Sequence, residues 1–132
     1  MSTDAAGVWL AYNVAENAAD FAAMGRLVAA DLDVTVNGRP AVSSAEDDER
    51  AMRELMAVYP DYRREVDEVL GTGNRAVARW RMVGTPASAE LPPLEVPGCS
   101  VITVEDGRIT RAHLYYQGAA LDEVLRAAGA GS

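Results

Sequence analysis

The segment Arg108–Gln117 carries the side chains best suited to proton transfer in this sequence. It follows a turn at Glu105–Gly107, and its alternating pattern predicts a strand. His113, Tyr115 and Gln117 alternate in it, so they share one face and present an imidazole, a phenol and an amide. Because histidine exchanges a proton readily near neutral pH, we interpret His113 and Tyr115 as catalytic and Gln117 as substrate-binding. The alternative for His113 is a core hydrogen bond or a place on the outer face of a sheet.

A second set of candidates lies in Tyr62–Leu70, which holds the acids Glu65, Asp67 and Glu68. A carboxyl group that faces an apolar cavity has a raised pKa and suits acid or base catalysis, which makes Glu65 a third candidate catalytic residue. The alternative is a solvated face on which the acids pair with arginines of this and a neighbouring strand. Those arginines are Arg63, Arg64, Arg79 and Arg81.

Aromatic side chains make up only 6% of the chain, so we expect most of them near the core or near a pocket. Such rings could wall a cavity for a flat or polycyclic substrate. The candidates for this binding role are Trp9, Tyr12, Tyr59 and Trp80, and for Trp80 a place in the core is the alternative. Cys99 has no basic neighbour in sequence, so we interpret it as a small apolar residue and not as a nucleophile.

Hydrophobic periodicity and turn residues predict the elements that would position these side chains. Helices come first, with a break at Asn17–Asp20, and hairpins dominate the second half, so the fold class is α+β with helices on one face of a curved antiparallel sheet. The helical residues of the first block are Val8, Leu10, Ala11, Val14, Ala15 and Ala18, followed by a stripe of Phe21, Met24, Leu27 and Val28. The predicted strands are 33–37, 62–70, 75–84, 98–104 and 108–117. The further predicted helices are 43–59, which Pro60 stops, and 118–128, and 85–97 is a loop with room for a short edge strand.

Composition excludes several classes of protein. The chain has 132 residues, a net charge of −8, one Cys and one His, so we expect one domain spanning 1–132 without a disulfide or a multi-histidine metal site. Its pI of about 4.5 argues against nucleic acid or an anionic membrane as a partner. We find no signal peptide, no membrane span and no phosphate loop, and therefore expect a cytoplasmic protein without a cofactor.

A resemblance to known proteins extends over nearly the whole chain and is carried by these segments: Asn17–Phe21, Leu27–Asp31, Tyr59–Tyr62, Asn74–Trp80 with Gly84–Thr85, and Val104–Ile109. In these segments the chain resembles the nuclear transport factor 2 superfamily, which has a cone-shaped, cystatin-like α+β fold around a mostly apolar cavity. Within this superfamily, the chain is similar to the SnoaL-like polyketide cyclases and to the small epoxide hydrolases related to limonene epoxide hydrolase.

The sequence departs from these relatives at their acids. Relatives often place a catalytic Asp near the end of the last strand, where no acid occurs between Arg108 and Gly118. The epoxide hydrolases carry Arg-x-Asp on the third strand, which corresponds to Arg79-Trp80-Arg81 here and retains only the first Arg. The resemblance implies substrate-binding roles for Arg79 and for Asn37, whose alternative is a turn residue. It also makes Glu65 the counterpart of an acid that polyether epoxide hydrolases use.

The resemblance implies a cofactor-free enzyme that acts on a small hydrophobic, polyketide-derived metabolite by acid/base chemistry, through cyclisation or isomerisation. One alternative is an epoxide hydrolase or epoxide-opening cyclase, and a second is a non-catalytic ligand-binding or accessory module. The resemblance further implies a homodimer formed through the outer face of the sheet, where Leu114 and Tyr116 are the expected contacts.

Overall fold

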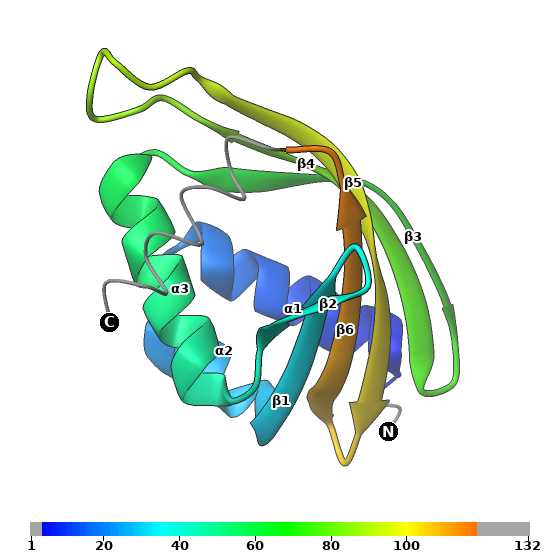
Figure 1. Cartoon of the computed structure of the whole chain (residues 1–132). Helices are drawn as coiled ribbons and strands as arrows, with labels where there is room; N and C mark the ends of the chain where they lie inside the picture. The colour runs from blue at the N-terminus through cyan, green and yellow to red at the C-terminus, as the bar shows by residue number, and fades with distance from the viewer. Residues whose placement is uncertain (1–3, 119–132) are drawn as a thin grey trace.

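A computed structural model describes residues 4–118 of the chain (Figure 1). Within these residues, three helices and six strands follow one another in the order α-α-β-β-α-β-β-β-β. Their bounds are α1 Ala5–Asn17, α2 Phe21–Arg26, β1 Val28–Val36, β2 Arg39–Val42, α3 Ala45–Val58, β3 Arg63–Thr72, β4 Arg75–Gly84, β5 Leu94–Glu105 and β6 Arg108–Tyr116. In the described residues, no helix is long and apolar enough to cross a membrane.

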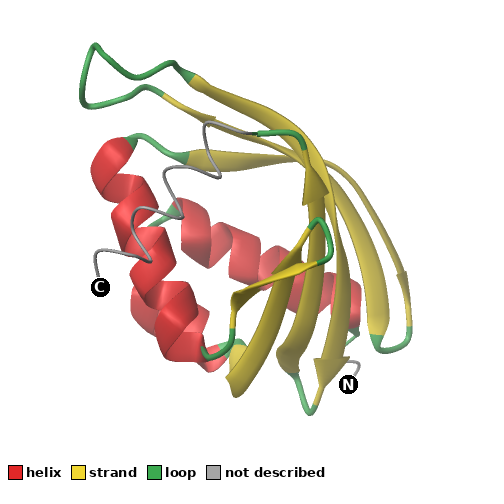
Figure 2. Ribbon diagram, viewed as in Figure 1, coloured by secondary structure: helices red, strands yellow, loops and turns green. Residues whose placement is uncertain are grey.

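The six strands form one curved sheet in the order β2-β1-β6-β5-β4-β3. All neighbours pair antiparallel except β1 and β6, which run parallel, with Val34 opposite Ala112 and Val36 opposite Leu114. The helices lie on the concave side of the sheet, with α1 across its inner face (Figure 2). This arrangement confirms the predicted α+β class with helices on one face of a curved sheet, and it leaves the inner face enclosed.

Local chemistry sets where the helices begin. Asp4 caps α1 by accepting a 2.7 Å hydrogen bond from the Gly7 amide, and Asp20 caps α2 through the Ala23 amide. Ser44 caps α3 because its hydroxyl oxygen accepts a 3.0 Å hydrogen bond from the Asp47 amide. Three acids in the first turn of α3 complement the positive end of the helix dipole.

Strand boundaries differ from the sequence predictions at three places. The second helix ends at Arg26, and β1 starts at Val28 because this residue pairs with Ile109 of β6 instead of continuing the helix. The segment after the turn at Asn37–Gly38 returns as β2. Strand β5 begins at Leu94, inside the predicted loop, although it contains Pro97. The partner β6 reaches only Gly98, so Pro97 lies in an edge segment, where proline is tolerated. The predicted helix over 118–128 lies outside the described residues.

Gly98 is required by close packing of the sheet. A Cβ atom at this position would lie 2.7 Å from Cη2 of Trp80 and 2.8 Å from both the Tyr115 carbonyl oxygen and the Tyr116 Cβ. The absent side chain therefore lets the rings of Trp80 and Tyr116 approach each other, with 6.2 Å between their centroids. Trp80 is fully buried, in agreement with its alternative place in the core.

Candidate active site

A small cavity of about 60 Å³ lies between α1, α3 and the inner face of the sheet. Residues of β1, α3 and β6 form its apolar wall. They are Val28, Leu32 and Val34 in β1, Met52 in α3, and Ile109, Ala112 and Leu114 in β6. The other lining residues are Trp9, Tyr12, Glu16, Asp48, Arg64 and Ser100. A few polar groups in an apolar enclosure are typical of a small-molecule site.

Asp48 supplies the carboxyl group of this cavity. The Tyr12 hydroxyl donates a hydrogen bond of 2.5 Å to its Oδ2 atom, while Oδ1 accepts none from the residues that the structure describes. Burial raises the pKa of Asp48 to about 6, and the nearby charge of Glu16 adds to this effect, while the Tyr12 hydrogen bond and Arg64 oppose it. The structure thus holds a carboxyl group that changes protonation close to neutral pH beside an apolar cavity.

Glu16 and Arg64 form a buried ion pair next to Asp48. Oε1 of Glu16 lies 3.1 Å from Nη1 of Arg64, and their side chains are 0% and 8% exposed. The Tyr62 hydroxyl donates a 2.5 Å hydrogen bond to the other carboxylate oxygen of Glu16. Burial by itself lowers the pKa of Arg64, but Glu16, together with smaller contributions from Tyr62, Tyr12 and Asp48, outweighs burial and raises that pKa above its ordinary value. Arg64 is therefore a permanent cation in the cavity wall.

Aromatic rings fix the position of this cation. Cζ of Arg64 lies 4.8 Å from the centre of the Trp80 ring and 6.0 Å from that of Trp9, within the range of cation–π attraction. The Trp80 indole donates a 2.9 Å hydrogen bond to Oγ of Ser100, which is itself buried in the wall. The site thus combines an acid on α3, a salt bridge from α1 to β3, and a hydroxyl on β5.

The predicted cavity face of β6 is wrong. Ala112, Leu114 and Tyr116 point inward, whereas Tyr115 and Gln117 are exposed and the His113 ring bonds through Nδ1 to Thr35 Oγ1 at 2.7 Å, on the opposite face. The cause is a β-bulge, because the ladder passes from Val104↔Ile109 to Thr103↔Arg111 and leaves Thr110 as an extra residue. Ile109 faces inward before the bulge, and the extra residue reverses the alternation after it. The same reversal turns Leu114 and Tyr116 away from the outer face expected to form a dimer.

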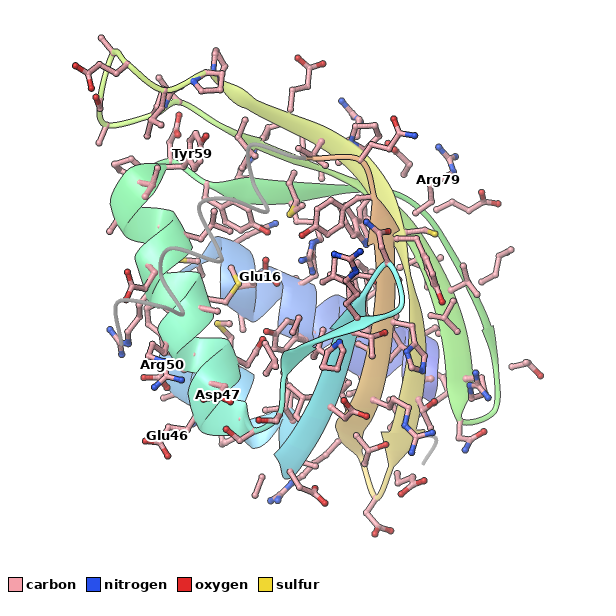
Figure 3. The ribbon with its side chains drawn as sticks, in the orientation of Figure 1. Glu16, Glu46, Asp47, Arg50, Tyr59 and Arg79 are labelled. Atoms are coloured by element: carbon pink, nitrogen blue, oxygen red, sulfur yellow. The ribbon has the colours of Figure 1, made fainter. Side chains whose placement is uncertain are left out.

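The predicted roles of Glu65 and Arg79 at the cavity are also wrong. Glu65 pairs with Arg63 and Arg81, and Arg79 lies 3.4 Å from Glu68 and 3.6 Å from Asp67, all on the outer face of β3 and β4. Figure 3 shows Glu16 inside the curve of the sheet and Arg79 outside it. The solvated face of paired charges, which was the alternative reading, is the arrangement found.

Asn37 and Tyr59 also lie outside the cavity wall. Asn37 occupies the β1–β2 turn with a φ of 51°, and its side-chain amide exchanges two hydrogen bonds with the Tyr116 backbone, at 2.9 and 3.2 Å. Tyr59 is buried, and its hydroxyl donates to the Pro92 carbonyl at 3.1 Å. Trp9 and Tyr12 line the cavity, while Trp80 lies behind it against Arg64 and Ser100. Their contact with a substrate stays a prediction.

The acids of the cavity, Asp48 and Glu16, were missed from the sequence although their spacing marks them. Asp48 lies on the same helical face as the buried residues Met52 and Leu55, and Glu16 on the same face as Tyr12. An acid within an apolar stripe was therefore the available signal. Among residues 4–118, no group of three or more His, Cys, Asp and Glu side chains could hold a metal ion.

Solved structures share this fold across most of their length. A protein from Kribbella flavida DSM 17836 has a TM-score of 0.75 and 21% identity, with 99% of this chain and 100% of that chain covered. A candidate ketosteroid isomerase from the same organism has a TM-score of 0.69 and 19% identity, covering 87% and 78%. A candidate polyketide cyclase from Sinorhizobium meliloti has a TM-score of 0.66 and 21% identity, covering 81% and 92%. At such identities the likeness shows the fold alone.

No curated protein matches the chain. The profile of the SnoaL-like domain matches residues 9–112, a span that begins at Trp9 in α1 and ends at Ala112 in β6, so that it includes both acids of the cavity and Arg64. The chain therefore belongs to the SnoaL-like domain family of nuclear transport factor 2-like folds.

Proposed function

We propose that the protein is a cofactor-free enzyme of the isomerase or cyclase kind, in which Asp48 moves a proton on a small hydrophobic, polyketide-derived substrate. One observation carries the proposal: the carboxyl group of Asp48 lies beside a mostly apolar cavity, and its Oδ1 atom accepts no hydrogen bond from the residues that the structure describes. The SnoaL-like family supports it, as do fold neighbours named as a candidate ketosteroid isomerase and a candidate polyketide cyclase.

In this proposal the two oxygens of Asp48 have different tasks. Tyr12 holds Oδ2, which leaves Oδ1 to accept a proton from a substrate carbon. In isomerisation the same oxygen returns this proton to a second carbon of the anion. In cyclisation the carbanion forms a bond to a second carbonyl carbon, and the proton goes to the new alkoxide. A pKa of about 6 suits this exchange because the group is mostly ionised at neutral pH and still holds a proton long enough to return it.

Cavity size restricts the part of the substrate that reacts inside it. A volume of about 60 Å³ has room for a few water molecules or for one end of a small molecule. We therefore expect the reacting carbonyl end to enter, with the rest of a larger substrate extending outward. The epoxide-opening alternative depended on Asn37 and Glu65, and neither residue lines the cavity.

The test is deuterium exchange into small ketones and candidate polyketide intermediates in heavy water, followed by NMR. We expect the wild type to speed exchange at carbon next to carbonyl, and Asp48→Asn to lose this by about 10²-fold or more, the usual contribution of a general base. The control is Glu49→Gln, which removes an acid of the same helix that forms an exposed ion pair with Arg53. This variant should retain the exchange rate of the wild type. The rate should fall as pH drops below about 6, because protonated Asp48 cannot accept the proton.

Equal rates in the wild type and in Asp48→Asn would contradict the proposal. Ligands that raise the melting temperature while the wild type leaves every one of them unexchanged would instead favour a non-catalytic binding module.

A further inference from the structure

We propose that Arg64, assisted by Ser100, binds the carbonyl oxygen of an uncharged ligand, and that the cavity discriminates against carboxylates. The inference rests on the cavity of the proposed function and adds the ligand class and the residues that recognise it. It makes Arg64 the counterpart of Asp48: one holds the oxygen, the other exchanges the proton.

An unused donor on Arg64 is the first observation. The Arg64 side chain is 8% exposed, yet its Nε atom has no hydrogen-bond partner within the described residues. Burying a donor of a charged group without an acceptor is energetically unfavourable. Arg64 lines the cavity, and we infer that its Nε–H group is the donor for an oxygen atom that enters there.

The guanidinium is held in place before any ligand arrives. Glu16 engages Nη1 at 3.1 Å, and the ring of Trp80 lies on Cζ at 4.8 Å. The carboxylate of Glu16 is itself held by Tyr62. A donor whose position is already fixed stabilises charge on an oxygen without the cost of reorganisation.

Ser100 offers a second donor on the neighbouring wall. Its Oγ atom accepts the hydrogen bond of the Trp80 indole, and the described residues provide no acceptor for its own hydroxyl hydrogen. The residue is 1% exposed and lines the cavity. Its hydroxyl hydrogen is therefore available to a ligand atom in the cavity, and the proposal assigns it to the oxygen that Arg64 binds.

Charge balance selects an uncharged ligand. Among residues 4–118, the titratable groups that line the cavity are Glu16, Asp48, Arg64 and Tyr12, and burial keeps Tyr12 in its neutral form by raising its pKa. Glu16 already neutralises Arg64, so ionised Asp48 leaves one net negative charge. A ligand carboxylate would add a second negative charge in a poorly solvated space, whereas a ketone adds none.

The experiment follows the Nε–H signals of ¹⁵N-arginine-labelled protein by NMR at pH 7.5 during titration with acetone and, separately, with acetate. The signal of Arg64 is assigned by through-bond correlation to its own backbone. We expect acetone to shift it saturably, while acetate at equal concentration binds at least 10-fold more weakly. The other arginines serve as internal controls. No shift with acetone, or an equal shift with acetate, would overturn the proposal, and a water bridging Nε and the unpartnered Asn13 Oδ1 would then be the acceptor.

Variants separate the parts of the proposal. Ser100→Ala should weaken acetone binding about 5- to 10-fold, whereas Ser43→Ala, at an exposed site, should leave it unchanged. Asp48→Asn should retain acetone binding and improve acetate binding about 10-fold, because the net negative charge is gone. Acetone affinity unchanged in Ser100→Ala, or acetate affinity unchanged in Asp48→Asn, would refute the corresponding assignment.

The two proposals can fail separately. Acetone binding without any Asp48-dependent deuterium exchange refutes the proposed function alone. Asp48-dependent exchange without a shift of the Arg64 signal refutes this inference alone.

Discussion

Glu16 and Arg64, 48 residues apart in the chain, meet across the interface of α1 and β3 as an ion pair that is almost completely buried. The pair joins the first helix to the sheet, and the hydroxyl of Tyr62 completes the set. Each charge is stable in this place only because the other is present, so removing one partner has a much larger effect than removing both.

Loss of Glu16 should therefore destabilise the protein strongly. We expect Glu16→Ala to lower the free energy of unfolding by about 3–5 kcal/mol, because Arg64 remains as an uncompensated buried cation. Urea unfolding followed by circular dichroism measures the change. Glu68→Ala, which breaks an exposed contact with Arg79, should cost less than about 1 kcal/mol. The double variant Glu16→Leu with Arg64→Met should recover much of the loss, and a double variant as unstable as Glu16→Ala would refute this account.

Asp48 should make stability depend on pH. Its pKa is about 6 in the folded protein and near 3.8 when unfolded, so folding is favoured below about pH 4 and this contribution is lost as pH rises through 6. Relative to the wild type, Asp48→Asn should gain stability between pH 4 and pH 7.5, by about 2 kcal/mol, since one pKa unit corresponds to about 1.4 kcal/mol. Urea midpoints across this range measure it.

Glu46→Gln is the control for the pH series, because it removes an exposed acid from the same helix. Its stability difference from the wild type should change little between pH 4 and pH 7.5. If the urea midpoints of Asp48→Asn and of the wild type changed in parallel with pH, Asp48 would ionise normally in the folded protein.

Gly98 and Gly25 should respond to alanine in opposite directions. Gly98→Ala places a methyl group against Trp80, Tyr116 and a backbone oxygen, so we expect a loss of about 1–3 kcal/mol. Gly25→Ala lies in α2 with no atom within 4 Å of the new methyl group, and should gain up to about 1 kcal/mol from helix propensity. Thermal unfolding distinguishes them, and a neutral Gly98→Ala would mean that the sheet relaxes at this point.

The Asn37 side chain should protect the backbone at the end of β6 from hydrogen exchange. Asn37→Gly tolerates the positive φ but loses both bonds to the Tyr116 backbone, so we expect roughly 10-fold faster hydrogen exchange of the Tyr116 amide and a cost of about 1 kcal/mol. Asp106→Gly changes a residue with a similar φ of 53° in the β5–β6 turn. It should leave the Tyr116 amide unaffected, and equal exchange in both variants would locate the effect in the backbone.

The elements could be predicted from the sequence because caps, turns and apolar periodicity act locally. Asp4, Asp20 and Ser44 begin helices by satisfying their own first turns, and the turn at Asp106–Gly107 joins β5 to β6. Val28 could not be assigned this way, because a distant strand decides its conformation.

Most residues predicted for the site lie elsewhere because the inner faces of β6 and α1 depend on features without a local signature. One extra residue at Thr110 exchanges the two faces of β6, and nothing in the sequence announces it. The first helix is rotated relative to its predicted apolar stripe, so Val14 is 69% exposed while Glu16 is buried. A buried acid is explained only by its partner Arg64, which comes from another part of the chain.

The parallel pairing of β1 with β6 also governs when the cavity can form. Thr35 and His113 are 78 residues apart and lie side by side in the finished sheet. During synthesis the chain holds α1, β1 and α3 long before their partner strand exists, so the apolar residues of β1 stay uncovered until β6 leaves the ribosome. Strands that are so far apart in the sequence pair late and slowly during folding. A nascent chain that stops before β6 therefore exposes the apolar β1 residues of the pocket, Val28, Leu32 and Val34, to chaperones and to other chains.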